Sequence, residues 1–321
     1  MTLRLKPHTW AFGEILKHLA TPVEEATDYA AVRADRARLM TSAAGKIVFG
    51  KPDRRVKTEE IEIGLRGRTL RALIHRPTGV GGNRPVVVHF HGGGWLQGAP
   101  EQTAWLTSRI AARTGAVVIS PSYRLAPENP FPAAVDDSWE TLGWLVEHAT
   151  KLGIDPDRLA VSGDSAGGNL AAVAALRARD EGGLNLRAQI LIYPAVEMYE
   201  KFASEIRLPN EPVLSAAAMT TFVRLYLGDA YGTFDQNASP LRASSHADLP
   251  PAFILTADRD PLLDNGVHYR DALRRAGVRV RYREYAQAVH GFVSLPGVVP
   301  AASRAAEDIA DFVAANVVLG R

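Results

Sequence analysis

The chain contains no cysteine among its 321 residues. That absence excludes disulfide frameworks, thiol catalysis and thiolate metal sites. No uninterrupted apolar run approaches the length of a transmembrane helix, so no membrane span is expected. The apolar residues near the N-terminus are interrupted by Glu14, Lys17 and His18 before a signal-peptide core could form, which favours a cytoplasmic protein.

Neither sign of charge dominates the chain. It has 37 lysines and arginines against 35 aspartates and glutamates, and the two kinds are interleaved. Because there is no basic stripe and no alternation of aromatic and basic residues, nucleic acid is not an expected partner. A hydrophobic content of 46% is typical of a globular chain, and the length suits one large domain with a smaller accessory piece.

Strand-like and helix-like segments alternate over most of the chain. Residues 61–63 and 70–74 alternate in polarity as half-exposed antiparallel strands do, and the continuous apolar run 85–90 predicts a strand buried on both faces. Further strands are expected at 116–120, 159–163, 188–193, 252–256 and 278–285, and helices at 102–113, 133–148, 166–179, 263–276 and 301–317. This rhythm predicts an α/β fold with a mostly parallel central sheet flanked by helices.

Two segments lie outside that rhythm. Residues 1–50 are predicted to be helical, with a helix start at 21–25, and their apolar face suits either simple packing or a lid. Residues 198–237 scatter apolar and aromatic side chains among prolines and charges, which indicates an inserted, mainly helical segment. The expected organisation is therefore N-terminal cap helices at 1–50, a core in two parts at 51–197 and 238–321, and an inserted cap at 198–237.

The stretch Gly163-Asp164-Ser165-Ala166-Gly167 has the pattern G-x-S-x-G, between a short strand-like segment and an apolar helix-forming one. A serine on so tight a turn is forced toward a strained backbone, and the flanking glycines avoid a clash. The turn also puts the Ala166 N–H at a helix N-terminus, where it can bind a developing oxyanion. Ser165 is the candidate nucleophile, although the bare pattern also occurs by chance.

A serine hydroxyl needs a base, and the base needs an orienting carboxylate. Only His246, His268 and His290 follow Ser165 in the chain. His268 falls within a predicted helix and His246 within a polar loop, whereas His290 comes just after the last predicted strand and beside a glycine. His290 is therefore the predicted base.

Three aspartates compete for the role of the acid, all in the segment that follows the strand at 252–256. Asp264 suits the start of the next helix. Asp258 lies closest to the strand, which favours a role in supporting the turn. Asp260, followed by a proline, has the best position and is the predicted acid, with Asp264 next.

Three consecutive glycines, residues 92–94, directly follow the buried strand at 85–90. Such a run is costly to order and makes sense where backbone N–H groups must approach a ligand closely. His89 and His91 are a weak alternative as metal ligands, because no further ligand cluster with metal spacing adjoins them. No metal and no cofactor are expected, and His91 is predicted to hydrogen-bond the loop into shape.

These pieces resemble the hormone-sensitive-lipase family of α/β-hydrolases. The matching motifs stand in the family's order over about residues 85–295, and they are His91-Gly92-Gly93-Gly94-Trp95, Tyr123-Arg124-Leu125-Ala126-Pro127-Glu128, Phe131 to Asp137, Gly163 to Asn169, Asp260-Pro261-Leu262 and His290-Gly291-Phe292. Within the segment from Tyr123 to Asp137, Arg124 is expected to pair with Glu128 or Asp136 beneath the site.

The resemblance implies an α/β-hydrolase fold with a helical cap and a carboxylesterase that acts on short- to medium-chain acyl esters through an acyl-enzyme. It implies oxyanion donors at Gly93, Gly94 and Ala166, a small-molecule ester as substrate, and a possible homodimer. An amide or acetyl-group hydrolase on the same triad is an alternative. A receptor on the same scaffold is less favoured, because the family's receptor members lack the histidine that His290 supplies.

Overall fold

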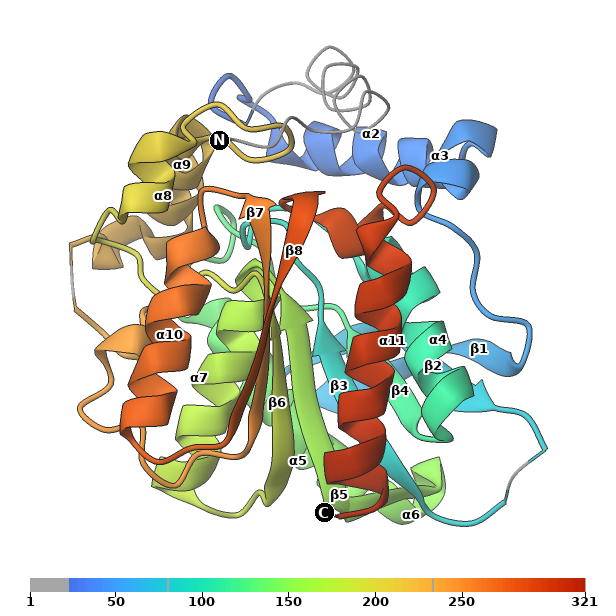
Figure 1. The fold of residues 1–321 in the computed structure, drawn as a ribbon. Helices are drawn as coiled ribbons and strands as arrows, with labels where there is room; N and C mark the ends of the chain where they lie inside the picture. The colour runs from blue at the N-terminus through green and yellow to red at the C-terminus, as the bar shows by residue number, and fades with distance from the viewer. Residues whose placement is uncertain (1–22, 80, 233, 321) are drawn as a thin grey trace.

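The central sheet has eight strands, and helices pack on both of its faces (Figure 1). The structure is a computed structural model, and it describes residues 23–79, 81–232 and 234–320. The strands are β1 (Val56–Leu65), β2 (Arg68–Pro77), β3 (Arg84–Phe90), β4 (Val117–Pro121), β5 (Ile154–Asp164), β6 (Leu186–Ile192), β7 (Ala252–Arg259) and β8 (Val280–Val289).

The strand order is β1-β2-β4-β3-β5-β6-β7-β8. β1 pairs with β2 and β2 pairs with β4 in antiparallel fashion, while every pair from β4 to β8 is parallel. The parallel strands therefore all end at one edge of the sheet, and loops at that edge can bring distant residues together. This architecture confirms the expected α/β-hydrolase fold, including the antiparallel pair at its start.

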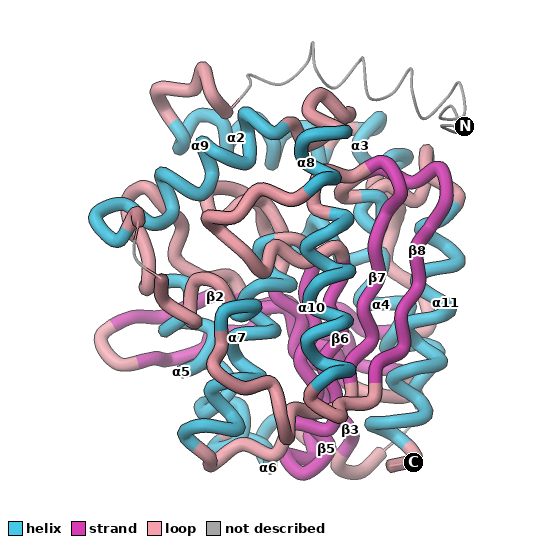
Figure 2. The backbone as a smooth tube through the Cα atoms, turned by 60° about the vertical axis from the view of Figure 1, so that its left-hand side comes forward, coloured by secondary structure: helices cyan, strands magenta, loops and turns pink. Residues whose placement is uncertain are grey.

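The main helices are α4 (Ala104–Thr114), α5 (Ala133–Glu147), α7 (Ala166–Glu181), α10 (Leu263–Arg275) and α11 (Ala301–Val313). Val86 and Val88 of β3 face one core with α5, α7 and α10, whereas Val87 faces the other core with α4 and α11. This alternation explains why the whole of β3 is buried and its central valines are apolar, since side chains on a strand point to opposite faces in turn. Figure 2 shows the same layers from the side.

Shorter helical elements complete the chain. They are α3 (Ala43–Val48), α6 (Ala149–Leu152), α8 (Ala203–Arg207), α9 (Ala216–Leu227), the 3₁₀ turns η1 (Pro100–Thr103), η2 (Gly228–Ala230), η3 (Pro240–Arg242) and η4 (Phe292–Ser294), and the π-helical turn η5 (Ala314–Val318). No helix in the described part of the chain is both long enough and apolar enough to cross a bilayer.

The first described helix is α2 (Tyr29–Thr41), and its start differs from the expected one. Residues 23–28 form turns, and Asp28 caps the helix by accepting a hydrogen bond from the Ala31 N–H at 2.9 Å. A helix start at 21–25 is therefore wrong, because the capping carboxylate lies later in the chain. The apolar face predicted for residues 10–19 lies outside the described residues.

Helices α2, α8 and α9 lie above the edge where the parallel strands end (Figures 1 and 2). The segment 198–237 contains α8, α9 and η2. Ser215, just before α9, donates a hydrogen bond to Glu24 at 3.0 Å. The N-terminal segment and the insert are thus in contact over that edge of the sheet.

A buried histidine on β2 gives the fold a predictable response to acid. His75 has no exposed surface and lies between the hydroxyls of Thr58 at 2.8 Å and Thr107 at 2.9 Å. Burial lowers the pKa of His75 to about 4 from 6.5. The native state therefore holds this ring neutral, and the stability that it contributes is present above pH 6.5 and is lost as the pH falls toward 4.

We expect His75→Gln to reduce this loss of stability at low pH. Glutamine can still bridge the two threonines but takes up no proton. Between pH 7 and pH 5 the free energy of unfolding of the wild type should fall by about 2 kcal/mol more than that of the variant. Urea unfolding at both pH values measures the difference. Equal losses in the two proteins would show that protonation of His75 is not the cause.

Candidate active site

Ser165 lies on the sharp turn between β5 and α7, in the conformation that the sequence predicts. Its backbone has φ 56° and ψ −118°, a strained combination for a residue with a side chain. A Cβ atom on Gly163 would lie 2.1 Å from the Gly167 carbonyl oxygen, and one on Gly167 would lie 2.0 Å from that of Phe90. Only glycine fits at both positions, so the turn can bring the strand and the helix this close.

The three residues predicted to act together are adjacent in the structure. His290 Nε2 lies 2.8 Å from Ser165 Oγ, and His290 Nδ1 lies 2.8 Å from Asp260 Oδ2. Asp260 is fully buried and its other carboxylate oxygen accepts the Leu262 N–H at 2.8 Å. Ser165 and His290 are 9% and 7% exposed, so the hydroxyl and the ring are shielded from most solvent.

The other two aspartates of this segment have different contacts. Asp264, in the first turn of α10, accepts the N–H of Ser204 at 2.7 Å, and the Ser204 hydroxyl donates to the Pro261 carbonyl at 2.6 Å. Asp258 accepts the N–H of Ala288 at 3.1 Å, which fixes the end of β8 just before His290. Asp264 therefore secures the insert, and Asp258 supports the strand that carries the histidine.

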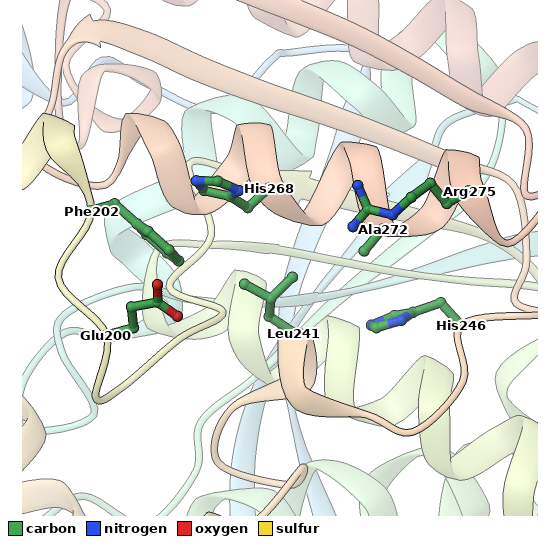
Figure 3. A pocket seen from close by; sticks show the side chains of 7 residues that line it. All are labelled: Glu200, Phe202, Leu241, His246, His268, Ala272 and Arg275. Carbon is green, nitrogen blue, oxygen red and sulfur yellow. The ribbon is translucent and has the colours of Figure 1, made fainter.

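The other two histidines after Ser165 line a separate cavity of about 340 Å³ beside α10 (Figure 3). His246 is buried there and its Nε2 lies 3.0 Å from the Pro240 carbonyl oxygen. His268 projects from α10, and its ring centroid lies 4.3 Å from that of Phe202. Among the described residues, neither ring contacts Ser165.

A second group of serine, histidine and aspartate lies inside the sheet, next to the first. His89 Nδ1 is 3.1 Å from Ser162 Oγ and His89 Nε2 is 3.4 Å from Asp164 Oδ1. Ser162 and His89 have no exposed surface and Asp164 only 2%, so a substrate cannot reach this hydroxyl. Asp164 instead accepts the N–H of Gly92 at 2.9 Å and thereby ties the turn at Ser165 to the glycine loop.

The glycine loop adopts backbone conformations that favour glycine. Gly93 has φ 127° and Gly94 has φ 61°. His91 Nδ1 lies 2.9 Å from the Gly92 carbonyl oxygen, and its ring stacks on Tyr123, whose hydroxyl donates to the His91 carbonyl at 2.7 Å. These contacts agree with a role for His91 in shaping the loop. Burial lowers the pKa of His91 to about 4, so the ring is neutral near pH 7.

We expect Gly93→Ala to damage turnover much more than folding. A Cβ atom there would lie 2.1 Å from the Gln97 carbonyl oxygen, so the loop must shift. Loss of one oxyanion donor lowers kcat by about 10²- to 10³-fold in acyl-transfer enzymes. Kinetics on a p-nitrophenyl ester measure this effect.

Gly183→Ala is the matched control for that variant. Its φ of 81° also disfavours a side chain, but no atom lies within 4 Å of the added Cβ. This variant should keep normal turnover. Similar kcat losses in both variants would mean that backbone strain, and not the position of the loop, causes the loss.

The expected partners of Arg124 are wrong. Arg124 donates from its backbone N–H to Asp137 at 2.7 Å and from its side-chain Nε to the same carboxylate at 3.0 Å. Asp137 is fully buried, and Arg68 also pairs with it. Glu128 instead pairs with Arg33 of α2, and Asp136 lies 3.6 Å from Arg177. A buried carboxylate needs charged or polar partners, which explains why both arginines converge on Asp137.

The insert touches the site through residues that no sequence motif indicated. Glu211, which is 8% exposed, pairs with Arg259, the residue just before Asp260. Phe222 of α9 lies so close to the glycine loop that a Cβ atom on Gly94 would be 2.2 Å from its ring. Tyr226 stacks on Trp95 with ring centroids 4.3 Å apart. The aromatic content of the insert was the signal for Phe222 and Tyr226, whereas no pattern pointed to Glu211.

Comparison with known proteins supports the fold and the class of enzyme. The model of a family described as having the alpha/beta hydrolase fold matches residues 87–294. Esterase LipI of Mycobacterium tuberculosis is 42% identical over 69% of this chain and 69% of its own length, and Carboxylesterase NlhH of the same organism is 41% identical over 78% and 80%.

A solved structure of a hyperthermophilic esterase from the archaeon Pyrobaculum calidifontis superposes with a TM-score of 0.88. It is 36% identical, and the match covers 98% of this chain and 99% of that one. The chain therefore belongs to the hormone-sensitive-lipase family of α/β-hydrolases. The expectation of a carboxylic ester hydrolase is confirmed by this membership and by the esterases among its relatives.

Proposed function

We propose that the protein is a serine carboxylesterase for short- to medium-chain acyl esters, with Ser165 as nucleophile, His290 as base and Asp260 as the orienting acid. The proposal rests on the two 2.8 Å contacts that connect the three side chains. Three distant parts of the chain supply them, namely the turn after β5, the loop after β7 and the loop after β8. Chance packing gives no reason for a hydroxyl, an imidazole and a buried carboxylate to align in this order.

In the first half of the reaction, Ser165 Oγ attacks the ester carbonyl carbon while its proton moves to His290 Nε2. The negative charge of Asp260 stabilises the imidazolium. Asp260 also keeps a proton on His290 Nδ1, so that Nε2 is free to take the proton of the serine. The N–H groups of Gly93, Gly94 and Ala166 are the proposed donors to the oxyanion, and the Ala166 N–H is at the N-terminus of α7. His290 then protonates the leaving alcohol, which gives an acyl-enzyme on Ser165.

In the second half, water replaces the alcohol. His290 Nε2 takes a proton from the water as it attacks the acyl carbonyl, and the same donors hold the second oxyanion. When this intermediate collapses, the proton returns to Ser165 Oγ and the carboxylic acid departs. The residue pair Ser165 and His290 therefore ends the cycle in its starting state.

The segments that lie over the site support the proposal that the substrate's acyl chain is short. We propose that α2, α3 and residues 198–237 form a cap, because Phe222 packs against the glycine loop and Ser215 bonds to Glu24. The low exposure of Ser165 and His290 agrees with a closed pocket that takes small substrates. The cytoplasmic location and the possible homodimer stay predictions.

A series of p-nitrophenyl esters from acetyl to palmitoyl tests this proposal. We expect kcat/KM to be highest between two and eight acyl carbons and to fall by at least tenfold at sixteen. A rate that rises up to palmitoyl would make the protein a lipase with an open acyl channel. Parallel assays with a p-nitroanilide and an acetylated amine separate the amide and acetyl-group alternatives, because the same triad could serve either bond.

Reaction of wild type with a fluorophosphonate distinguishes the enzyme from the receptor alternative. Activated serine should be labelled within minutes, whereas a serine without a base should not react. Peptide mapping should place the label on Ser165. Absence of labelling would favour a binding protein on this scaffold.

A further inference from the structure

A fully buried tyrosine packs directly against the ring of the proposed base. Tyr193 is the first residue after β6, and its ring centroid lies 4.7 Å from that of His290, with the two planes tilted by 56°. Aromatic rings attract one another at this separation. Because Tyr193 has no exposed surface, it cannot touch a substrate and can influence the reaction only through its neighbours.

The backbone around Tyr193 is bonded to the turn that carries the serine. The Ser165 N–H donates to the Ile192 carbonyl at 2.9 Å, and the Ala195 N–H donates to the Ser165 carbonyl at 3.3 Å. The Tyr193 N–H donates to the Leu255 carbonyl at 2.6 Å, in β7, the strand that leads to the proposed acid. This segment is therefore connected to two parts of the proposed triad by its backbone and to the third by the tyrosine ring.

The conformation of Tyr193 is unusual for an aromatic residue. Its φ of 35° lies in the left-handed region, which residues with a bulky side chain rarely adopt. Such strain persists only where surrounding contacts fix the residue, and it clusters at functional sites. Phe292, which is also fully buried, lies edge-on to the tyrosine with ring centroids 5.6 Å apart and leaves that ring little freedom.

His290 needs a contact of this kind because hydrogen bonds alone do not fix the plane of an imidazole. Its Nδ1 lies 2.8 Å from Asp260 and its Nε2 lies 2.8 Å from Ser165, so the ring can still rock about the line that joins the two nitrogens. Rocking turns the lone pair of Nε2 away from the serine proton, and a hydrogen bond weakens as it departs from linearity. A rigid ring packed against the imidazole limits this motion.

The ring of Tyr193, and not its hydroxyl, makes this contact. The hydroxyl forms no hydrogen bond within the described part of the chain. Burial raises the pKa of Tyr193 well above its ordinary value, and the nearby Val293 N–H acts weakly in the opposite direction, so the hydroxyl is neutral near pH 7. Phenylalanine at this position should therefore keep the contact.

We propose that Tyr193 is a positioning residue, which holds the imidazole of His290 in the plane that the attack by Ser165 requires. The inference rests on the proposed esterase function and deepens it. Tyr193 takes no proton and touches no reacting atom. It keeps the base aligned in both half-reactions, so its loss should slow the chemical steps and leave substrate binding intact.

Replacement of the tyrosine by methionine tests the proposal, because methionine fills similar space but is flexible and offers no rigid ring. We expect Tyr193→Met to lower kcat for a p-nitrophenyl ester by about 10- to 100-fold, while KM changes by less than about twofold. Tyr193→Phe keeps the ring and should keep kcat within about twofold of wild type.

The rate of fluorophosphonate labelling gives a second readout that a folding defect does not move. The final extent of labelling counts the folded enzyme, whereas the rate reports how well the base activates Ser165. For Tyr193→Met the rate should fall by the same factor as kcat, and the extent per folded protein should equal that of wild type. Tyr193→Leu repeats the test if the methionine variant does not fold.

Tyr269→Met is the matched control. Tyr269 of α10 is also fully buried, and its hydroxyl likewise forms no hydrogen bond within the described residues. Its ring lies edge-on to His246, a histidine outside the site, with centroids 5.4 Å apart. This variant should lose stability but keep kcat and the labelling rate within about twofold of wild type.

Several results would overturn the proposal. Unchanged kcat and labelling rate in Tyr193→Met would mean that the ring positions nothing, and an equal loss in Tyr193→Phe would assign the effect to the hydroxyl. A loss through KM alone would make Tyr193 part of the substrate pocket, and an equal loss in Tyr269→Met would reflect general instability. The esterase function is tested separately, because a wild type that neither hydrolyses esters nor is labelled contradicts that function whatever the variants show.

Discussion

Ser165→Ala should lower kcat for a p-nitrophenyl ester by about 10⁴- to 10⁶-fold. The hydroxyl that lies 2.8 Å from His290 Nε2 is the proposed nucleophile, and alanine removes it while keeping a Cβ atom on the turn. The variant keeps substrate binding and the proposed oxyanion donors, so a small residual rate over water is expected. Initial rates with wild type and variant at equal concentration give the ratio.

The chain offers a close control for this experiment in Ser162→Ala. Ser162 also lies within hydrogen-bond distance of a histidine, but it is fully buried within β5. Its loss should leave kcat within about fivefold of wild type and act mainly on stability, because one buried hydrogen bond contributes about 1 kcal/mol. If Ser162→Ala abolished activity and Ser165→Ala did not, the roles of the two groups would be reversed.

Asp260→Asn should produce the second largest loss, about 10⁴-fold in kcat near neutral pH. The amide cannot stabilise the imidazolium, and its NH₂ group can hold His290 in the wrong tautomer, with the proton on the nitrogen that faces Ser165. The fold should survive, since the side chain keeps its size and its contact with the Leu262 N–H. Turnover against pH, with circular dichroism as a check on folding, measures the effect.

Asp264→Asn is the matched control, four residues further along the chain in the first turn of α10. Asp264 accepts a hydrogen bond from Ser204 of the insert, whereas Asp260 is the aspartate that contacts His290. We expect its loss to lower the free energy of unfolding by about 1 to 3 kcal/mol and to change kcat by less than tenfold. A kcat loss as large as that of Asp260→Asn would leave the identity of the acid open between the two.

Local patterns were enough to predict much of this molecule. The alternation of apolar runs and helix-forming segments gave the parallel sheet, because each run could be buried only between two helical layers. The glycines around Ser165 predicted a tight turn, since no side chain fits at Gly163 or Gly167. The position of His290 after the last strand was equally informative, because parallel strands end at a common edge.

Contacts between distant segments could not be predicted in the same way. Arg124 turned out to pair with Asp137, and α2 began at Tyr29 after a cap at Asp28. Nothing in the chain order indicated that Ser204 and Glu211 would bond to residues beside Asp260. Such pairings depend on how the insert docks on the core, and several acidic residues compete locally for each arginine.

The sequence by itself thus determined the class of fold, the tight turn at Ser165 and the three segments that carry the proposed triad, because backbone sterics and burial act on neighbouring residues. Tertiary structure alone decided that Arg124 pairs with Asp137 and that Phe222 of the insert packs against the glycine loop. Those contacts depend on distances between residues that lie far apart in the chain. They are fixed only when the core, the insert and the N-terminal helix pack together.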